Sequence, residues 1–293
     1  MPLNALLSQL VWFFFLFMAL APVVRQRFLI AARRRMIQEI ERVRGSRVIV
    51  LIHRQESLSF LGIPLFRYIT MEDAEDILRA IRLTPDTMPI DLVLHTPGGL
   101  VLASQQIANA LCDHAAKVTA FVTHYAMSGG TLLALAADEI VMDPHAVLGS
   151  VDPQIGQYPA ASILKVVEAK EPKDIDDQTI ILADVSRKAL RQVYDLVRSV
   201  LVSNGMEEGK AEELSGQLTQ GVWTHDYPIG AKQARELGLP ISTELPVAIH
   251  ELMSLYPQPS QRTSSVDYVP VPYAPVPAPP TPTAPPAERR TEK

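Results

Sequence analysis

Cysteine and histidine are scarce in this sequence, which limits the kinds of site that it can hold. The 293 residues include a single cysteine, Cys112, and only 7 histidines. One cysteine cannot form a disulfide within the chain, which fits a reducing compartment. The sequence also lacks the HExxH and CxxC spacings of common metal sites. We therefore expect neither a metal nor a cofactor.

Positive charge is also not in excess, and it is missing from the start of the chain. A net charge of -5 gives no reason to expect a nucleic-acid partner. No charged residue occurs from Pro2 to Val24, and arginines then follow at positions 25, 27, 33, 34 and 35. This stretch is long enough to cross a bilayer, so residues 3–24 are predicted to form a transmembrane helix. The arginines place the rest of the chain in the cytoplasm. A cleaved signal peptide is the alternative, but its basic first segment is missing.

Composition divides the remainder of the chain into three segments. Residues 25–45 are predicted to form a basic juxtamembrane helix that lies at the membrane surface. Residues 46–255 are predicted to form the folded domain. From Pro257 the chain is rich in Pro, Ala, Ser and Thr, with almost no branched aliphatic residue other than valine. Because such a segment cannot bury a core, we expect residues 256–293 to be a disordered tail.

Strand-like and helix-like segments alternate in the first half of the predicted domain. Strands are expected at 47–53, 90–95, 117–123 and 139–142, and helices at 71–83, 100–114 and 130–137. This alternation is typical of a parallel sheet with crossover helices, so the expected fold class is α/β. After Pro153 the pattern is helical, with helices expected at 161–169, 177–204, 207–218 and 230–237.

Two glycine pairs follow expected strands, in Pro97-Gly98-Gly99 and in Ser128-Gly129-Gly130. Turns at the carboxyl ends of parallel strands are where ligands bind in such folds. Glycine lets backbone approach backbone or substrate. A serine at such a turn lies beside the unpaired N–H groups that begin a helix, where a nucleophile and an oxyanion hole can form. The alternative is that Ser128 only caps the helix.

The order of four motifs resembles a known group of proteins. The motifs are His95-Thr96-Pro97-Gly98-Gly99, Ala126-Met127-Ser128-Gly129-Gly130, Ala137-Asp138-Glu139-Ile140-Val141 and the segment 231–239. Together they resemble the Clp/crotonase superfamily over roughly residues 47–242, and within it the serine dehydrogenase proteinase family. Signal peptide peptidase A and the NfeD-type proteases are related. The resemblance implies an αβ spiral of ββα units and a homo-oligomer.

The resemblance also implies roles for the glycine turns. Ser128 would be the nucleophile of a serine peptidase. The oxyanion hole would be formed by backbone N–H groups of Gly98 or Gly99 and of Gly129. His95 and His124 flank the two motifs and could line one cleft, or they could be framework residues.

The general base is the open question, because a serine needs one to act as a nucleophile at neutral pH. The Clp protease subunit has a histidine after its third strand, but segment 149–153 contains none here. The membrane-linked relatives use lysine, so the resemblance implies a Ser–Lys dyad. Lys188 is the first candidate, from a match to the start of a long helix, and Lys173 is the second, from its Lys-Asp-Ile tripeptide. Lys165 and Lys170 are further candidates. His225 is an alternative base if folding brings it near Ser128.

The sequence therefore predicts a membrane-anchored serine endopeptidase that cleaves peptides or unfolded protein segments near the membrane. Two alternatives remain open. One is a catalytically inactive membrane scaffold of the same fold, and the other is a crotonase-like acyl-CoA enzyme.

Overall fold

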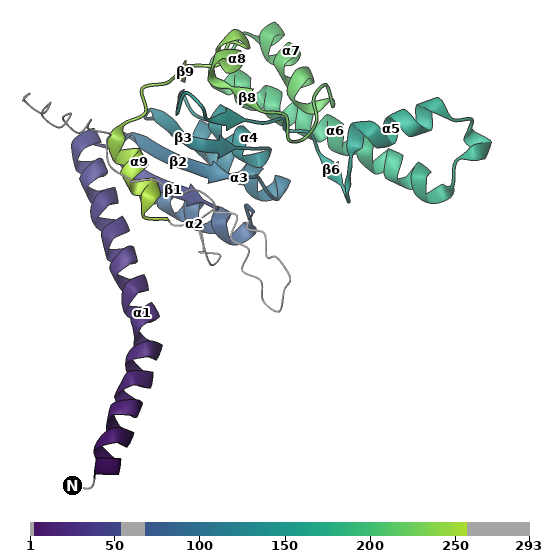
Figure 1. Cartoon of the computed structure of the whole chain (residues 1–293). Helices are drawn as coiled ribbons and strands as arrows, with labels where there is room; N and C mark the ends of the chain where they lie inside the picture. Colours follow the sequence, from purple (N-terminus) through teal and green to yellow (C-terminus); the bar gives the residue numbers. More distant parts are fainter. Residues whose placement is uncertain (1–2, 54–67, 257–293) are drawn as a thin grey trace, which may run out of the picture. The chain divides into compact units, whose positions relative to one another are not determined.

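The computed structural model describes residues 3–53 and 68–256, without the side chains of 3–11 and of several further positions up to 22 (Figure 1). The first helix, α1, runs without a break from Leu3 to Arg44. Among the residues that the structure describes, no helix is both long and apolar enough to cross a membrane. The span predicted at 3–24 falls mostly on positions without described side chains, so it stays a prediction. The predicted tail, apart from Tyr256, lies outside the described residues.

A mostly parallel sheet forms the centre of the domain, as the alternation of segments predicted. Its main path has the order β1-β2-β3-β4-β9, and neighbours along it are parallel. These strands are β1 (Arg47–Ile52), β2 (Ile90–Thr96), β3 (Val118–Ala126), β4 (Glu139–Met142) and β9 (Ile241–Ser242). Two short strands extend the sheet beside β3. They are β5 (Val147–Leu148), which is parallel to the end of β3, and β8 (Ile229–Gly230), which is antiparallel to β5.

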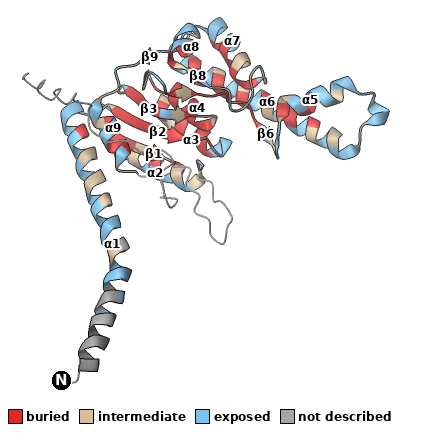
Figure 2. Ribbon diagram, in the orientation of Figure 1, coloured by how far each residue is buried: buried red, intermediate tan, exposed pale blue. Residues whose placement is uncertain are grey.

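The sheet is covered on both faces, because alternate residues of each strand point to opposite sides. In β2, Leu92 and Leu94 belong to the larger core cluster, whereas Val93 belongs to a smaller one. The smaller cluster also contains Ile40 of α1 and Ile249 of α9 (Val247–Ser254). Figure 2 shows the burial of β2 and β3. Burial on both faces explains why apolar residues stand at consecutive positions in these strands, as in Leu92-Val93-Leu94.

Three helices connect the first strands and pack in the larger core cluster. They are α2 (Met71–Arg82), α3 (Val101–Cys112) and α4 (Gly129–Leu135). Thr70 and Asp73 form a capping box at the start of α2, which explains where this helix begins. All seven residues of α4 are buried. Ser128 directly precedes this buried helix, just beyond the carboxyl end of β3.

The second half of the domain is helical, as predicted. It contains α5 (Ala160–Ala169), a 3₁₀ turn at Pro172–Asp174, α6 (Asp177–Ser203), α7 (Glu208–Thr219) and α8 (Ala231–Glu236). Between the sheet and α5, the short strands β6 (Gln154–Ile155) and β7 (Tyr158–Pro159) pair with each other. Helix α6 contacts α3 and α4, and its buried Val193 belongs to the larger core cluster. The long helix therefore helps to enclose the end of the sheet that carries the glycine turns.

Candidate active site

Ser128 occupies a strained turn between β3 and α4. Its φ of 49° and ψ of -117° make it the one non-glycine residue with positive φ in the described part of the chain. Holding a non-glycine residue in such a region costs about 1–3 kcal/mol, and this kind of strain is concentrated at functional sites. Although Ser128 precedes α4, its side chain makes no capping hydrogen bond to the helix. The capping alternative is therefore not what the structure shows.

The Pro97-Gly98-Gly99 turn lies directly against Ser128. Gly98 has a φ of 104°, and a Cβ added to it would lie 2.7 Å from Ser128 Cβ and 2.9 Å from the backbone N of Gly129. A Cβ on Gly99 would lie 2.3 Å from the backbone N of Ile69. Side chains at either position would collide with backbone atoms, so both glycines are needed for this approach. The two glycine motifs are thus brought together, as the sequence predicted.

Hydrogen bonding within the two turns sets the directions of the glycine N–H groups. Ile69 N donates to Gly98 O at 2.7 Å, and Leu100 N donates to Ile69 O at 2.9 Å. Because Ile69 bonds to the residues on either side of Gly99, the Gly99 N–H points away from Ile69. Gly98 N instead donates to Thr96 Oγ1 at 3.2 Å. The N–H of Gly129 is in the first turn of α4, where no acceptor within the helix exists.

A groove with a volume of about 390 Å³ runs past Ser128 and both glycine turns. Most of its wall is apolar, and includes Leu100, Leu132, Val151, Val193 and Leu196. Among the described residues, no lysine or arginine lines it. Its polar lining includes Ser128 itself and a small cluster formed by Asp152, Gln154 and His225. Tyr68 and Ser104 are the other polar side chains of the described lining.

The cluster holds a histidine against a buried carboxylate. Asp152 is 3% exposed, and its carboxylate accepts hydrogen bonds from His225 Nδ1 at 2.8 Å, Ser150 Oγ at 2.6 Å and Gln154 Nε2 at 2.6 Å. Burial alone raises the pKa of Asp152, but the hydrogen bonds from His225 and Ser150 outweigh it and lower this pKa below its ordinary value. The hydrogen bond to Asp152 also raises the pKa of His225, against the effect of burial. An ion pair is therefore favoured.

Comparison with known proteins identifies the family. Residues 1–278 match the family of ClpP-like SDH-type serine proteinases. The chain belongs to this family. It is 56% identical to the uncharacterized protein MJ1495 of Methanocaldococcus jannaschii over 263 residues, which are 89% of each chain. It is 52% identical to MJ0137 of the same organism over 272 residues, which are 92% of this chain and 95% of the relative. The family resemblance seen in the sequence is confirmed.

More distant similarities cover less of the chain. Membrane protein NfeD1b of Bacillus subtilis is 32% identical over 110 residues, or 37% of this chain and 25% of that protein. Among solved structures, a mutant of the 1510-N membrane-bound stomatin-specific protease in complex with a substrate peptide gives a TM-score of 0.42. That match has 17% sequence identity and covers 61% of this chain and 72% of the other.

The two favoured lysines are not brought to this groove. Lys188 is 69% exposed and pairs with Asp184 at 2.6 Å. The sequence match had placed Lys188 at the start of a long helix. Helix α6 begins at Asp177, however, so Lys188 lies inside the helix. Lys173 is 73% exposed and pairs with Glu171 at 2.6 Å. Of the bases considered from the sequence, His225 is the one that lines the groove among the described residues.

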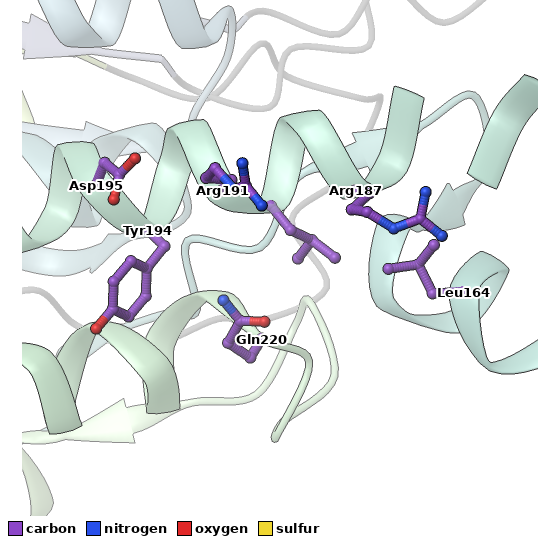
Figure 3. Close-up of a pocket in the computed structure, with 7 residues that line it drawn as sticks. Leu164, Arg187, Arg191, Tyr194, Asp195 and Gln220 are labelled. Atoms are coloured by element: carbon purple, nitrogen blue, oxygen red, sulfur yellow. The ribbon is translucent and has the colours of Figure 1, made fainter. Parts of the chain in front are cut away.

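Two other features lie apart from the groove. A hollow of about 430 Å³ lies beside α6. Its lining includes Arg187, Arg191 and Tyr194, which Figure 3 labels. The helical repeat places these residues on the side of α6 opposite Val193 and Leu196, which line the Ser128 groove. His95 is buried and lies edge-to-face with His124, with 5.3 Å between ring centroids. Neither histidine is among the described residues of the groove lining, so we treat both as framework residues.

Proposed function

We propose that the protein is a serine endopeptidase in which Ser128 is the nucleophile. The observation that carries this proposal is the strained Ser128 turn packed against the Gly98-Gly99 turn at the edge of a groove. Membership of a family of serine proteinases supports it. The substrate class is a peptide or an unfolded protein segment, because the apolar groove can accept an extended chain.

In the proposed reaction, Ser128 Oγ attacks the carbonyl carbon of the scissile peptide bond. The negative charge that develops on the carbonyl oxygen is stabilised by the N–H groups of Gly99 and Gly129. A single donor of this type contributes about 10²- to 10³-fold to the rate. Gly98 contributes by having no side chain, since its N–H is already bonded to Thr96. This assignment narrows the three glycines predicted from the sequence to two donors and one spacer.

The two alternatives from the sequence are less well supported. An inactive scaffold would not need a serine held at a costly φ against the Gly98-Gly99 turn. An acyl-CoA enzyme would need cations for the phosphates of its substrate, and no lysine or arginine lines the described part of the groove. Both observations favour peptide hydrolysis.

Labelling with a fluorophosphonate probe tests the nucleophile. We expect the purified protein to be labelled at Ser128, with the label located by mass spectrometry of the digested chain. Ser128→Ala should abolish labelling and peptide hydrolysis together. Ser199→Ala is the matched control, because Ser199 is exposed on α6 and is not part of the groove lining. Labelling of Ser128→Ala at the rate of the unmodified protein would refute the proposal.

We further propose that residues 3–24 anchor the protein in a membrane, with the domain on the cytoplasmic side, and that the protein forms a homo-oligomer. The support for the anchor is the uncharged stretch up to Val24 and the arginines that follow it. The oligomer is supported by the family resemblance alone. Added protease should digest the domain in inverted vesicles and leave it intact in right-side-out cells. The reverse pattern would place the domain outside. Light scattering in detergent measures the oligomeric state.

A further inference from the structure

We propose that Thr96 is a positioning residue for the oxyanion hole, and that His53 orients the Thr96 hydroxyl. This inference rests on the proposed serine peptidase function, in which the N–H groups of Gly99 and Gly129 stabilise the oxyanion. Neither Thr96 nor His53 belongs to the described lining of the groove. Both therefore act on the reaction through the glycine turns, without touching the substrate.

Thr96 is the residue at which the two glycine turns are joined. It is fully buried, ends β2 and pairs with the end of β3. Its backbone O accepts a hydrogen bond at 2.9 Å from the N–H of Met127, which directly precedes Ser128. Its side-chain Oγ1 accepts from Gly98 N at 3.2 Å. One residue thus holds both the turn that carries the nucleophile and the turn that carries the Gly99 N–H.

The methyl group of Thr96 makes a further contact with the serine turn. A Cβ added to Gly130 would lie 2.6 Å from Thr96 Cγ2, so the methyl group fills the space beside that glycine. A β-branched side chain has few χ1 rotamers. Because the methyl group and the hydroxyl share one Cβ, packing of the methyl group against Gly130 keeps the hydroxyl directed at Gly98.

The position of Gly98 matters because it sets the direction of the next N–H group. The N–H of Gly98 is held by Thr96 Oγ1, and its C=O accepts from Ile69 N at 2.7 Å. In a planar trans peptide, the C=O of one residue and the N–H of the next point in opposite directions. The two hydrogen bonds at Gly98 therefore orient the Gly99 N–H, which is one of the two proposed oxyanion donors.

His53 determines the direction of the Thr96 hydroxyl. The His53 ring is buried, and its Nδ1 lies 2.9 Å from Thr96 Oγ1, closer than the competing acceptor Gly98 O at 3.4 Å. On the other side of the ring, Nε2 lies 3.5 Å from the carboxylate of Asp73. A carboxylate only accepts hydrogen bonds, so it favours the ring form with the proton on Nε2. Nδ1 then accepts the Thr96 hydroxyl proton, and the lone pairs of Oγ1 are left for Gly98 N.

Backbone hydrogen bonds fix this chain of side chains at both ends. His53 N donates to His95 O at 2.7 Å, which holds the ring beside the end of β2. Asp73 is fixed by the capping box at the start of α2. Ile69, just before this helix, bonds directly to Gly98. The start of α2 therefore reaches the glycine turn by two routes, and supporting contacts of this kind keep catalytic groups in their productive geometry.

The test separates the hydroxyl of Thr96 from its methyl group, using the full-length protein in detergent and a fluorogenic peptide. Thr96→Val keeps the shape of the side chain and removes the hydroxyl. One oxyanion donor contributes about 10²- to 10³-fold, and a misdirected donor loses part of this, so kcat should fall by at least about 10-fold. KM should stay within about twofold, because the donor acts on the transition state. Thr96→Ser keeps the hydroxyl and should stay within about threefold of the unmodified kcat, well below the contribution of a donor.

Binding of inhibitors provides a readout that a purely structural role would not change. A peptide aldehyde forms an adduct with Ser128 that carries the oxyanion, whereas a product peptide does not. In Thr96→Val, affinity for the aldehyde should fall by about the same factor as kcat, and affinity for the product peptide should be unchanged. Thr84→Val is the matched control. Thr84 is also buried, but its hydroxyl donates to Ala80 O at 2.8 Å at the far end of α2.

A double variant tests whether His53 acts through Thr96. His53→Leu removes the acceptor of the Thr96 hydroxyl and should lower kcat without raising KM. If both residues act through one hydrogen bond, the double variant His53→Leu/Thr96→Val should lose no more than the larger of the two single losses. Losses that multiply would mean that His53 acts by another route. Melting curves show which variants fold, and if Thr96→Val does not fold, His53→Leu decides by the same criteria.

Two results would overturn this inference and leave the proposed function intact. One is a folded Thr96→Val protein with nearly full kcat, and the other is a loss that appears in KM alone. Every variant in this series keeps Ser128, so the nucleophile is tested separately. If Ser128→Ala retained activity and labelling, the proposed function itself would fail. The two failures are therefore distinguishable.

Discussion

Replacing Gly98 by alanine should damage both the stability and the activity of the protein. At the φ of 104° that Gly98 adopts, any L-residue is strained, at a cost of about 1–3 kcal/mol. The new Cβ would also lie 2.7 Å from Ser128 Cβ and 2.8 Å from the backbone O of Met127. Overpacking of this kind costs about 1–3 kcal/mol more. The expected total of about 2–6 kcal/mol is a large part of the stability of a typical domain.

Gly238→Ala provides the matched control for this prediction. Gly238 has a φ of 84°, but nothing lies within 4 Å of a Cβ added there. It should therefore show the backbone strain without the collision. Urea unfolding of both variants gives the difference, which we expect to be about 1–3 kcal/mol. Any Gly98→Ala protein that folds should also react with fluorophosphonate about 10²-fold more slowly, because the turn must move away from Ser128. Equal unfolding of the two variants, with normal labelling, would refute the reasoning.

Three further predictions concern the groove. Gly129→Ala should abolish fluorophosphonate labelling, because its Cβ would lie 2.3 Å from Ser104 Oγ. Adding Ser104→Gly removes this contact and should restore part of the labelling rate. If the rate is not restored, the alanine acts through another contact. The ion pair should contribute most stability between the ordinary pKa values of 3.8 for Asp152 and 6.5 for His225. The pKa of Asp152 is lowered, so its contribution to stability is lost as the pH falls through that pKa. The pKa of His225 is raised, so its contribution to stability is lost as the pH rises through that pKa. Melting temperatures of the unmodified protein and Asp152→Asn across pH 3–9 should differ most inside this window, and a constant difference would contradict the assignment. Peptide libraries should show cleavage next to Leu or Phe and little next to Lys or Glu, because the groove wall is apolar; a preference for charged residues would contradict this view of the groove.

The strands and the glycine turns were predictable because their physical requirements are local. Strand β2 is buried on both faces, which favours an apolar run such as Leu92-Val93-Leu94 at its centre. Gly98 adopts a backbone conformation that other residues rarely reach, so the pair of glycines marks the turn in the sequence itself. The strain at Ser128 could not be read in this way, since serine occurs commonly before helices.

The contact between Asp152 and His225 could not be predicted, because it depends on distant pairing. The two residues are 73 positions apart, and the strands that bring them together, β5 and β8, have two residues each. Strands of that length leave no periodic pattern. In the sequence His225 is only one of several possible bases, and segment 149–153 contains no histidine, although it does contain Asp152. Helix α9 was missed for a similar reason, since its eight residues are stabilised by contacts with α1 and β3.

The pairing of β5 with β8 has a consequence for the newly made chain. Ser128 and both glycine turns are complete once the ribosome has passed β3 and α4. Of the bases considered from the sequence, however, only His225 lines the described part of the groove, and it arrives there only when residues near Ile229 pair with Leu148. Contacts between distant residues form late, since the intervening chain must first be closed into a loop. A partly synthesised protein would therefore carry its nucleophile without the means to activate it, and would be unable to cleave neighbouring chains until its domain is nearly complete.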